Sequence, residues 1–156
     1  MAAGAVGGLA GAWTMNQVHA AIAKLRKPAQ SQAGAQGESE DATVKAADKV
    51  IAIATCHHLS REQKKKAGPV VHYAFGAVMG ALYGAAVQRQ RHLSPVAGVM
   101  FGSALFFGAD EIGVPLAGLS GPPTAYPIST HLEALTAHLV YGVTADFVRR
   151  AVRAAF

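Results

Sequence analysis

Two apolar stretches with glycine at every fourth position constrain this chain more than any other feature. Residues 69–88 carry no formal charge and contain Gly76, Gly80 and Gly84, and residues 94–118 begin with a similar pair, Gly98 and Gly102. In water, a glycine inside a helix costs up to about 1 kcal/mol relative to alanine. In lipid, small residues let helix backbones approach closely. The pattern therefore predicts membrane-embedded helices that pack through glycine.

The rest of the chain extends this pattern to a whole fold. Charged residues make up only 15% of the sequence, against about 25% in an average soluble domain. We therefore expect an all-α membrane bundle that forms a single domain over residues 1–156. The apolar stretches predict four membrane-embedded helices, of which residues 69–88 are the clearest; the other three are about 2–24, 94–118 and 130–150.

A polar loop and one amphipathic helix separate the first two predicted spans. Residues 26–41 are rich in polar residues and contain proline and glycine, so they are predicted to form a loop. Over residues 42–57, Val44, Ala47 and Ile51 recur at helical spacing with lysines opposite. Such a helix is expected to lie on the membrane interface or on the bundle, not across the bilayer.

Ionisable residues inside the apolar stretches are the candidate functional groups. An acid within a membrane segment is costly and usually faces the bundle interior or a water-filled cavity, and histidine changes charge near neutral pH. The candidate polar cluster consists of His72, Asp110, Glu111, His131 and His138. On an α-helix the adjacent Asp110 and Glu111 point about 100° apart, so both cannot share one face. Either the acids are embedded, or the helix ends before them and they lie among headgroups.

Simpler interpretations compete with each of these features. The glycines are most simply explained by packing, of one stripe against the other or against another protomer, although they could also line a narrow path. Histidines can be purely structural. His131 and His138 are seven apart, so they lack the tight spacing of a metal pair, and the Cys56-His57-His58 run does not have the separation that zinc ligands need. No catalytic motif is present, and no enzyme activity, metal or cofactor is predicted; haem or metal held by the histidines is a weaker alternative.

Several motifs resemble those of the YagU-like bacterial inner-membrane proteins, a family with a domain of unknown function. The matching runs are Asp41–Lys45, His72–Gly76, Gly108–Glu111, Val114–Leu116, Gly118-Leu119 with Pro122-Pro123, Tyr126–His131, His138–Tyr141 and Arg149-Arg150. Longer members have an acid in the first helix, where this chain has Asn16 and Gln17. The resemblance implies a multi-pass protein of the bacterial cytoplasmic membrane and attaches to no reaction.

Charge indicates partners and, less directly, orientation. The net charge of +5 comes from basic residues at the ends of apolar segments, which suits anionic lipid headgroups. A nucleic-acid partner is not expected, because no basic face with stacking aromatics is present. Basic residues slightly favour a cytoplasmic long loop, whereas the resemblance implies that both termini are cytoplasmic, and we follow the resemblance.

Two functions are compatible with the sequence. The first is a homo-oligomer that conducts protons, ions or a small solute through the intramembrane acids and histidines. The second is a non-catalytic accessory or scaffold subunit whose glycine faces dock another membrane protein.

Overall fold

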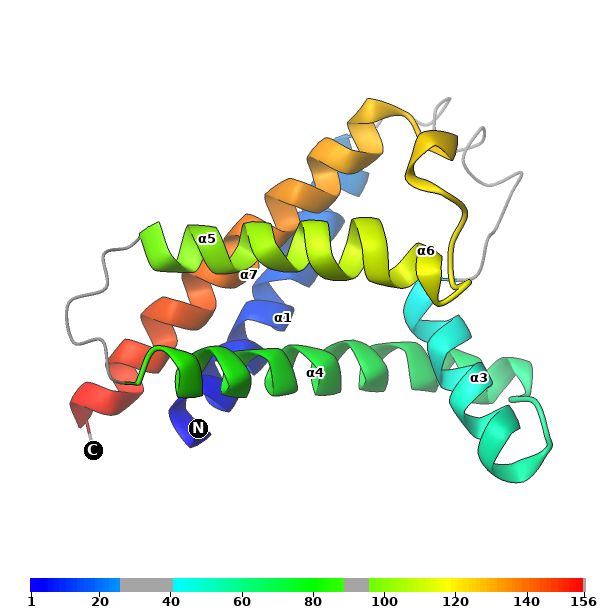
Figure 1. Cartoon of the computed structure of the whole chain (residues 1–156), viewed down its shortest axis with the longest axis horizontal. Coiled ribbons are helices and arrows are strands. Elements are labelled where there is room, and N and C mark those ends of the chain that lie inside the picture. The colour runs from blue at the N-terminus through cyan, green and yellow to red at the C-terminus, as the bar shows by residue number, and fades with distance from the viewer. Residues whose placement is uncertain (26–40, 89–95, 156) are drawn as a thin grey trace.

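Three long helices and one composite helix make up most of the chain in the computed structural model, which describes residues 1–25, 41–88 and 96–155 (Figure 1). All regular structure in these ranges is helical. The elements are α1 (Ala2–Leu25), α3 (Ala42–Thr55), α4 (Arg61–Ala86), α5 (Val96–Leu105), the π-helix η1 (Phe106–Gly113), α6 (Val114–Leu116), the 3-10 turn η2 (Pro123–Ala125) and α7 (Ile128–Ala155).

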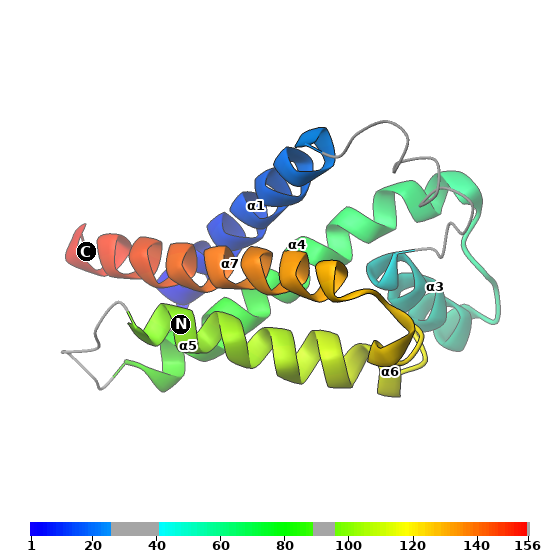
Figure 2. The ribbon, with the colours of Figure 1, turned by 90° about the horizontal axis from the view of Figure 1, so that it is seen from above.

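The helices pack in the order α4, α1, α7, α5, which differs from their order in the chain. Helix α1 contacts both α4 and α7, and α5 contacts a neighbouring face of α7 (Figures 1 and 2). The N-terminal Gly4 of α1 lies against Gly84 near the end of α4, so these two helices are antiparallel. Helix α7 is likewise antiparallel to α1 and to α5, because Gly7 and Gly98 both lie against its C-terminal half.

Glycines form the contact between α1 and α4. A Cβ atom added to Gly80 would lie 2.6 Å from the Cα of Gly8, and one added to Gly84 would lie 2.9 Å from the Cα of Gly4. Real Cβ atoms do not approach other atoms this closely, so any larger residue must push the two backbones apart. The two helices therefore touch backbone to backbone along this seam.

The glycines of α5 make an equivalent contact, but with α7. A Cβ atom on Gly98 would lie 2.8 Å from the carbonyl oxygen of Gly142, and one on Gly142 would lie 2.6 Å from the backbone nitrogen of Gly102. The two stripes recognised in the sequence, in residues 69–88 and 94–118, thus have different partners within the chain. They do not pack against each other.

Large apolar side chains lie mostly on the outside, while the interior is built from small residues. The buried positions of α1 are four glycines and Ala12, and no large side chain among the described residues is less than 2% exposed. Exposed large apolar residues occur on every long helix, including Leu9, Trp13, Phe75, Val78, Leu82, Val99, Met100, Phe107, Val143 and Phe147. This distribution reverses the one expected of a water-soluble bundle.

Of the described helices, only the composite helix Val96–Leu116 is long and apolar enough to cross a membrane by length and composition. The sequence predicted four spans and took residues 69–88 as the clearest. The other long helices fall short of the same test because alanine, glycine, histidine and terminal charges dilute their apolar residues. Of the four predicted spans, only residues 94–118 therefore contain a described helix that is long and apolar enough to cross a membrane.

Two helices begin earlier than expected. Helix α4 starts at Arg61, where the side chains of Ser60 and Gln63 form a reciprocal capping box, and Pro69 lies inside the helix and not in its first turn. The helix that the sequence placed from residue 130 begins at Ile128. The capping box at Ser60 thus opens the long helix itself. The predicted loop over 26–41 lies almost entirely outside the described residues.

The amphipathic segment forms α3, as its spacing predicted. Its N-terminus is capped by the carboxylate of Asp41, which accepts from the backbone N–H of Thr43 at 2.9 Å. Helix α3 packs on the first half of α4, where Val44 lies against Gly68. Val50 and Ile53 remain exposed, so only part of the apolar face is covered.

The segment that carries both acids is a π-helix, which the sequence reasoning did not anticipate. The backbone N–H of Val114 donates to the carbonyl of Ala109, five residues earlier. Pro115 has no N–H to offer the carbonyl of Glu111, and in an α-helix its ring would crowd that carbonyl. The wider register accommodates the proline without ending the helix. Asp110 and Glu111 therefore lie within a continuous helical segment from Val96 to Leu116.

Candidate functional site

A cavity of about 910 Å³ lies between α4 and the α5–η1 segment. Its α4 wall includes His72, Phe75 and Met79, and Leu105 and Asp110 belong to the opposite wall. The floor comes from α1 and α7, and the first turn of α3 lines one end. A volume of this size is typical of a small-molecule site.

Polar groups from five helical elements line this cavity. They are Asn16 and His19 of α1, Asp41 and Thr43 at the start of α3, His72 of α4, Asp110 of η1, and His138 and Tyr141 of α7. No lysine or arginine contributes to the lining within the described ranges. Three of the five residues predicted as a polar cluster, namely His72, Asp110 and His138, therefore face one space.

Hydrogen bonds to backbone carbonyls orient two of the histidines. The Nδ1 of His138 lies 2.8 Å from the carbonyl oxygen of Ala134, and the Nε2 of His72 lies 3.3 Å from that of Ala12. Because a carbonyl only accepts, each of these nitrogens is the donor. In the neutral ring the other nitrogen is then an acceptor, so each neutral imidazole retains a site that could accept a proton or a ligand N–H.

Asp110 is one of two acids that line the cavity, and Asp41 is the other. Asp110 is partly buried, and its carboxylate lies within electrostatic reach of His138 and His19. An acid in this position can bind a cation or exchange a proton with a neighbouring imidazole. Asp110 lines the large cavity, whereas Glu111 lines only the smaller cavity of about 150 Å³, which the two acids share.

Glu111 and His131, the other two predicted cluster residues, form a separate pair. The Nδ1 of His131 lies 2.6 Å from a carboxylate oxygen of Glu111, and its Nε2 lies 3.0 Å from the carbonyl oxygen of Pro123. A ring that donates at both nitrogens to two acceptors is the charged imidazolium. The pair joins the end of the composite helix to the start of α7, beside a smaller cavity of about 150 Å³.

Aromatic side chains bound the large cavity towards the termini. The hydroxyl of Tyr141 crosses from α7 to donate to the carbonyl of Gly76 at 2.6 Å. Further along, the rings of Tyr83 and Phe101 stack at a centroid distance of 4.3 Å and connect α4 to α5. These aromatic side chains thus lie between the cavity and the end of the bundle that carries both termini.

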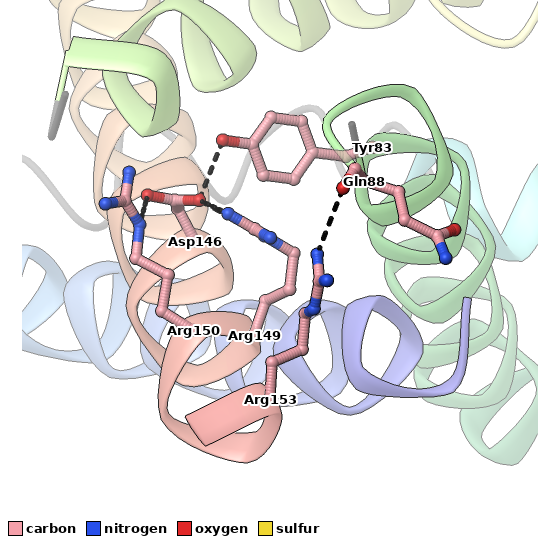
Figure 3. A network of polar contacts seen from close by, with 6 residues as sticks. All are labelled: Tyr83, Gln88, Asp146, Arg149, Arg150 and Arg153. Atoms are coloured by element: carbon pink, nitrogen blue, oxygen red, sulfur yellow. Dashed lines mark hydrogen bonds and ion pairs between the residues drawn. The ribbon is translucent and has the colours of Figure 1, made fainter. Parts of the chain in front are cut away.

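The hydroxyl of Tyr83 belongs to a buried charge network around Asp146 (Figure 3). Asp146 accepts from the Tyr83 hydroxyl at 2.9 Å, from Arg149 at 2.6 Å and from Arg150 at 2.6 Å. The side chains of Asp146 and Arg149 are 5% and 6% exposed. The guanidinium of Arg149 also lies over the Tyr83 ring, 5.6 Å from its centroid. This network connects the C-terminal ends of α4 and α7.

Sequence reasoning missed two parts of this arrangement. It left His19 out of the cluster, and it treated Arg149 and Arg150 as charges at the end of a span. The spacing of Asp146 to these arginines, three and four residues, is that of helical ion pairs and could have indicated the network. Nothing in the sequence alone could show that α1 brings His19 to the same cavity as Asp110.

The site offers no preformed metal centre within the part of the chain that the structure describes. No three histidine, cysteine or acidic side chains there lie close enough together to hold an ion. The Cys56-His57-His58 run lies at the exposed end of α3.

Comparison with known proteins assigns no activity. A family model described as "Protein of unknown function (DUF1440)" matches residues 47–147, which is more than half of the chain. The match extends from within α3 into α7 and includes His72, Asp110 and His138. No curated protein and no solved structure matches the chain.

Proposed function

We propose that this chain, which belongs to the DUF1440 family of proteins of unknown function, is a multi-pass protein of the bacterial inner membrane that moves protons, or a small solute together with protons. The observation that carries the proposal is the cavity in which Asp110 faces histidines from three other helices. These are groups that can pass a proton between them near neutral pH. The proposal includes the more specific assignment of this chain to the YagU-like inner-membrane proteins, which rests on the shared motifs described above.

The membrane setting is supported by the distribution of side chains over the helix surfaces. Glycine and alanine fill the interior, while residues such as Phe75, Leu82 and Val99 point outward. In lipid, outward apolar side chains are solvated and small residues bring the helices together. Helices α1, α4 and α7 would then cross beside the composite helix even though their own composition is only weakly apolar.

The proposed orientation places both termini in the cytoplasm. The N-terminus of α1 and the C-terminus of α7 lie at the same end of the bundle (Figure 1). Arg149, Arg150 and Arg153 are at that end, but more basic residues near span ends lie on the long-loop side, so the orientation rests on the family resemblance. Helix α3, whose first turn lines one end of the cavity, would then be near the periplasmic face.

In this fold the glycine stripes pack within the chain, so they are not available to bind another protomer or another protein. Gly76, Gly80 and Gly84 contact α1, and Gly98 and Gly102 contact α7. A homo-oligomer or an accessory role in a larger complex would have to use the outward apolar side chains instead. Native mass analysis in mild detergent tests such assembly, and a single monomeric species would count against both.

A flux assay in vesicles tests the proposed function. Purified protein in liposomes should dissipate an imposed pH gradient faster than protein-free vesicles do, and Asp110→Asn should reduce the rate to the protein-free level. Glu111→Gln is the matched control, because it changes the adjacent acid that is held by His131 outside the large cavity. Equal rates with and without protein, or full activity in Asp110→Asn, would contradict the proposal.

A further inference from the structure

We infer that the large cavity binds a lipophilic organic cation, with its charge beside Asp110 and its apolar part along α4 and α5. The inference rests on the proposed function in that it names a ligand class for the same site. It uses two features that proton movement does not require, namely the apolar length of the cavity and the sign of its charge.

The charge of the lining favours a cation. Asp110 and Asp41 both line the space, and with neutral histidines their formal charge is not offset by any lysine or arginine in the described lining. Asp41 is already engaged as the cap of α3. Asp110 is therefore the carboxylate that is left to meet a ligand.

The remaining charged groups near the cavity are accounted for. The imidazoles come from α1, α4 and α7, as His19, His72 and His138. Glu111 is bonded to His131, and Glu133 acts on His19 from α7.

The shape and apolar lining favour a ligand that also has a hydrophobic part. Away from the acids, the walls are formed by Met15, Phe75, Met79 and Leu105. Methionine and phenylalanine adapt to irregular apolar ligands, and an aromatic face attracts organic cations. A hydrated inorganic ion would leave this part of the cavity without a partner.

The position of the cavity provides a route for such a ligand from the membrane. Its two walls belong to α4 and α5–η1, which make little direct contact with each other. The packing order places these helices at opposite ends of the series α4, α1, α7, α5. A lipophilic cation dissolved at the membrane surface could therefore enter between them without separating a glycine seam.

Two ions of nearly the same shape and opposite charge test the inference. Tetraphenylphosphonium and tetraphenylborate should be titrated into the full-length protein in nanodiscs of zwitterionic lipid, with empty nanodiscs as the blank. We expect saturable binding of the phosphonium only, weakened at least tenfold in Asp110→Asn and little changed in Glu111→Gln. Equal binding of both ions, or phosphonium binding that is unaffected by Asp110→Asn, would overturn the inference.

The outcomes separate this inference from the proposed function. Binding of tetraphenylphosphonium that depends on Asp110, without any flux, supports the cation site and refutes transport. Proton flux that depends on Asp110, with no binding of tetraphenylphosphonium, refutes the cation site and leaves transport standing. The comparison of the two ions on the unmodified protein needs no variant, so it is decisive even if Asp110→Asn fails to fold.

Discussion

Asp146 is the residue on which the cytoplasmic end of the proposed topology depends most. Its carboxylate accepts hydrogen bonds from Tyr83, Arg149 and Arg150. Removing one partner of a buried ion pair leaves the other charge without compensation. The arrangement is therefore expected to be intolerant of loss of the acid, even though exchange of the whole network for apolar residues could be tolerated.

Asp146→Asn should destabilise the protein by about 3 kcal/mol, the typical cost of breaking a buried pair on one side. Thermal unfolding in detergent, followed by circular dichroism, measures the effect. Glu62→Gln is the control, because the pair between Glu62 and Lys65 is on the surface and such pairs contribute little. Equal melting temperatures for Asp146→Asn and the unmodified protein would contradict the prediction.

Asp48 gives the turn between α3 and α4 a dependence on pH. Its carboxylate accepts from the backbone N–H of Leu59 at 2.6 Å and lies 2.9 Å from the Nδ1 of His58. The Leu59 N–H, the His58 ring and the charge of Lys64 hold the pKa of Asp48 below its usual value. Because the folded state favours the ionised carboxylate, its contribution to stability is present above the ordinary aspartate pKa and is lost as the pH falls through the lowered pKa.

Asp48→Ala should therefore lower the melting temperature at pH 7, and the difference from the unmodified protein should shrink as the pH is lowered towards 3. Melting curves of both proteins across this pH range measure the convergence. A difference that stays constant with pH would show that Asp48 acts through packing and not through its charge.

At the scale of elements, the seams between helices depend on the absence of side chains. The contact of Gly80 with Gly8 and that of Gly102 with Gly142 leave no space for a Cβ atom. Overpacking of a tight interior typically costs about 1–3 kcal/mol, and here the atoms that must move belong to the backbone.

Gly80→Ala should destabilise the monomer by at least about 2 kcal/mol, because even a methyl group must separate α1 from α4. Ala74→Leu, at an exposed position of the same helix, is the control and should be nearly neutral. Unfolding of both variants in detergent, with their molecular mass measured in parallel, separates folding from assembly. A Gly80→Ala protein that melts normally but changes its oligomeric state would instead support packing between protomers.

The helices and some of their ends could be predicted from the sequence, whereas their partners could not. Helical spacing in residues 42–57 predicted α3, and the residues of the Ser60 capping box are recognisable by eye. The partner of each glycine stripe depends on how α1 inserts between α4 and α7, and such a contact between distant residues has no local pattern. The π register of η1 likewise depends on how Pro115 is accommodated within a continuing helix.

The candidate site was predictable in its chemistry but not in its grouping. Acids and histidines in apolar stretches stood out, and His72, Asp110 and His138 do line one cavity. Glu111 and His131 were placed in the same cluster because nothing in the sequence reveals that they bond to each other. Adjacent residues such as Asp110 and Glu111 can have different partners: Glu111 bonds to His131, whereas Asp110 also lines the large cavity with the histidines.

At the scale of the whole molecule, the outward apolar surface and the single cysteine allow the proposed topology to be tested. Cys56 is exposed at the end of α3, which the proposal places on the periplasmic side. In intact spheroplasts, Cys56 should react with a membrane-impermeant maleimide. A cysteine introduced at Val99 in a Cys56→Ala background should react only after detergent is added. Labelling of Cys56 in inverted vesicles alone would reverse the orientation.

The backbone contact between α1 and α4 has a consequence for how this chain tolerates genetic change. Every missense change at Gly4, Gly8, Gly80 or Gly84 adds at least a Cβ atom where the neighbouring main chain already lies. By contrast, exchanges among large apolar residues such as Phe75 and Leu82 alter only an outer surface. In a water-soluble protein the large buried residues tolerate substitution least. A complete map of single substitutions in this chain should show the reverse, with the least tolerance at the glycines and the most at the large outward apolar residues.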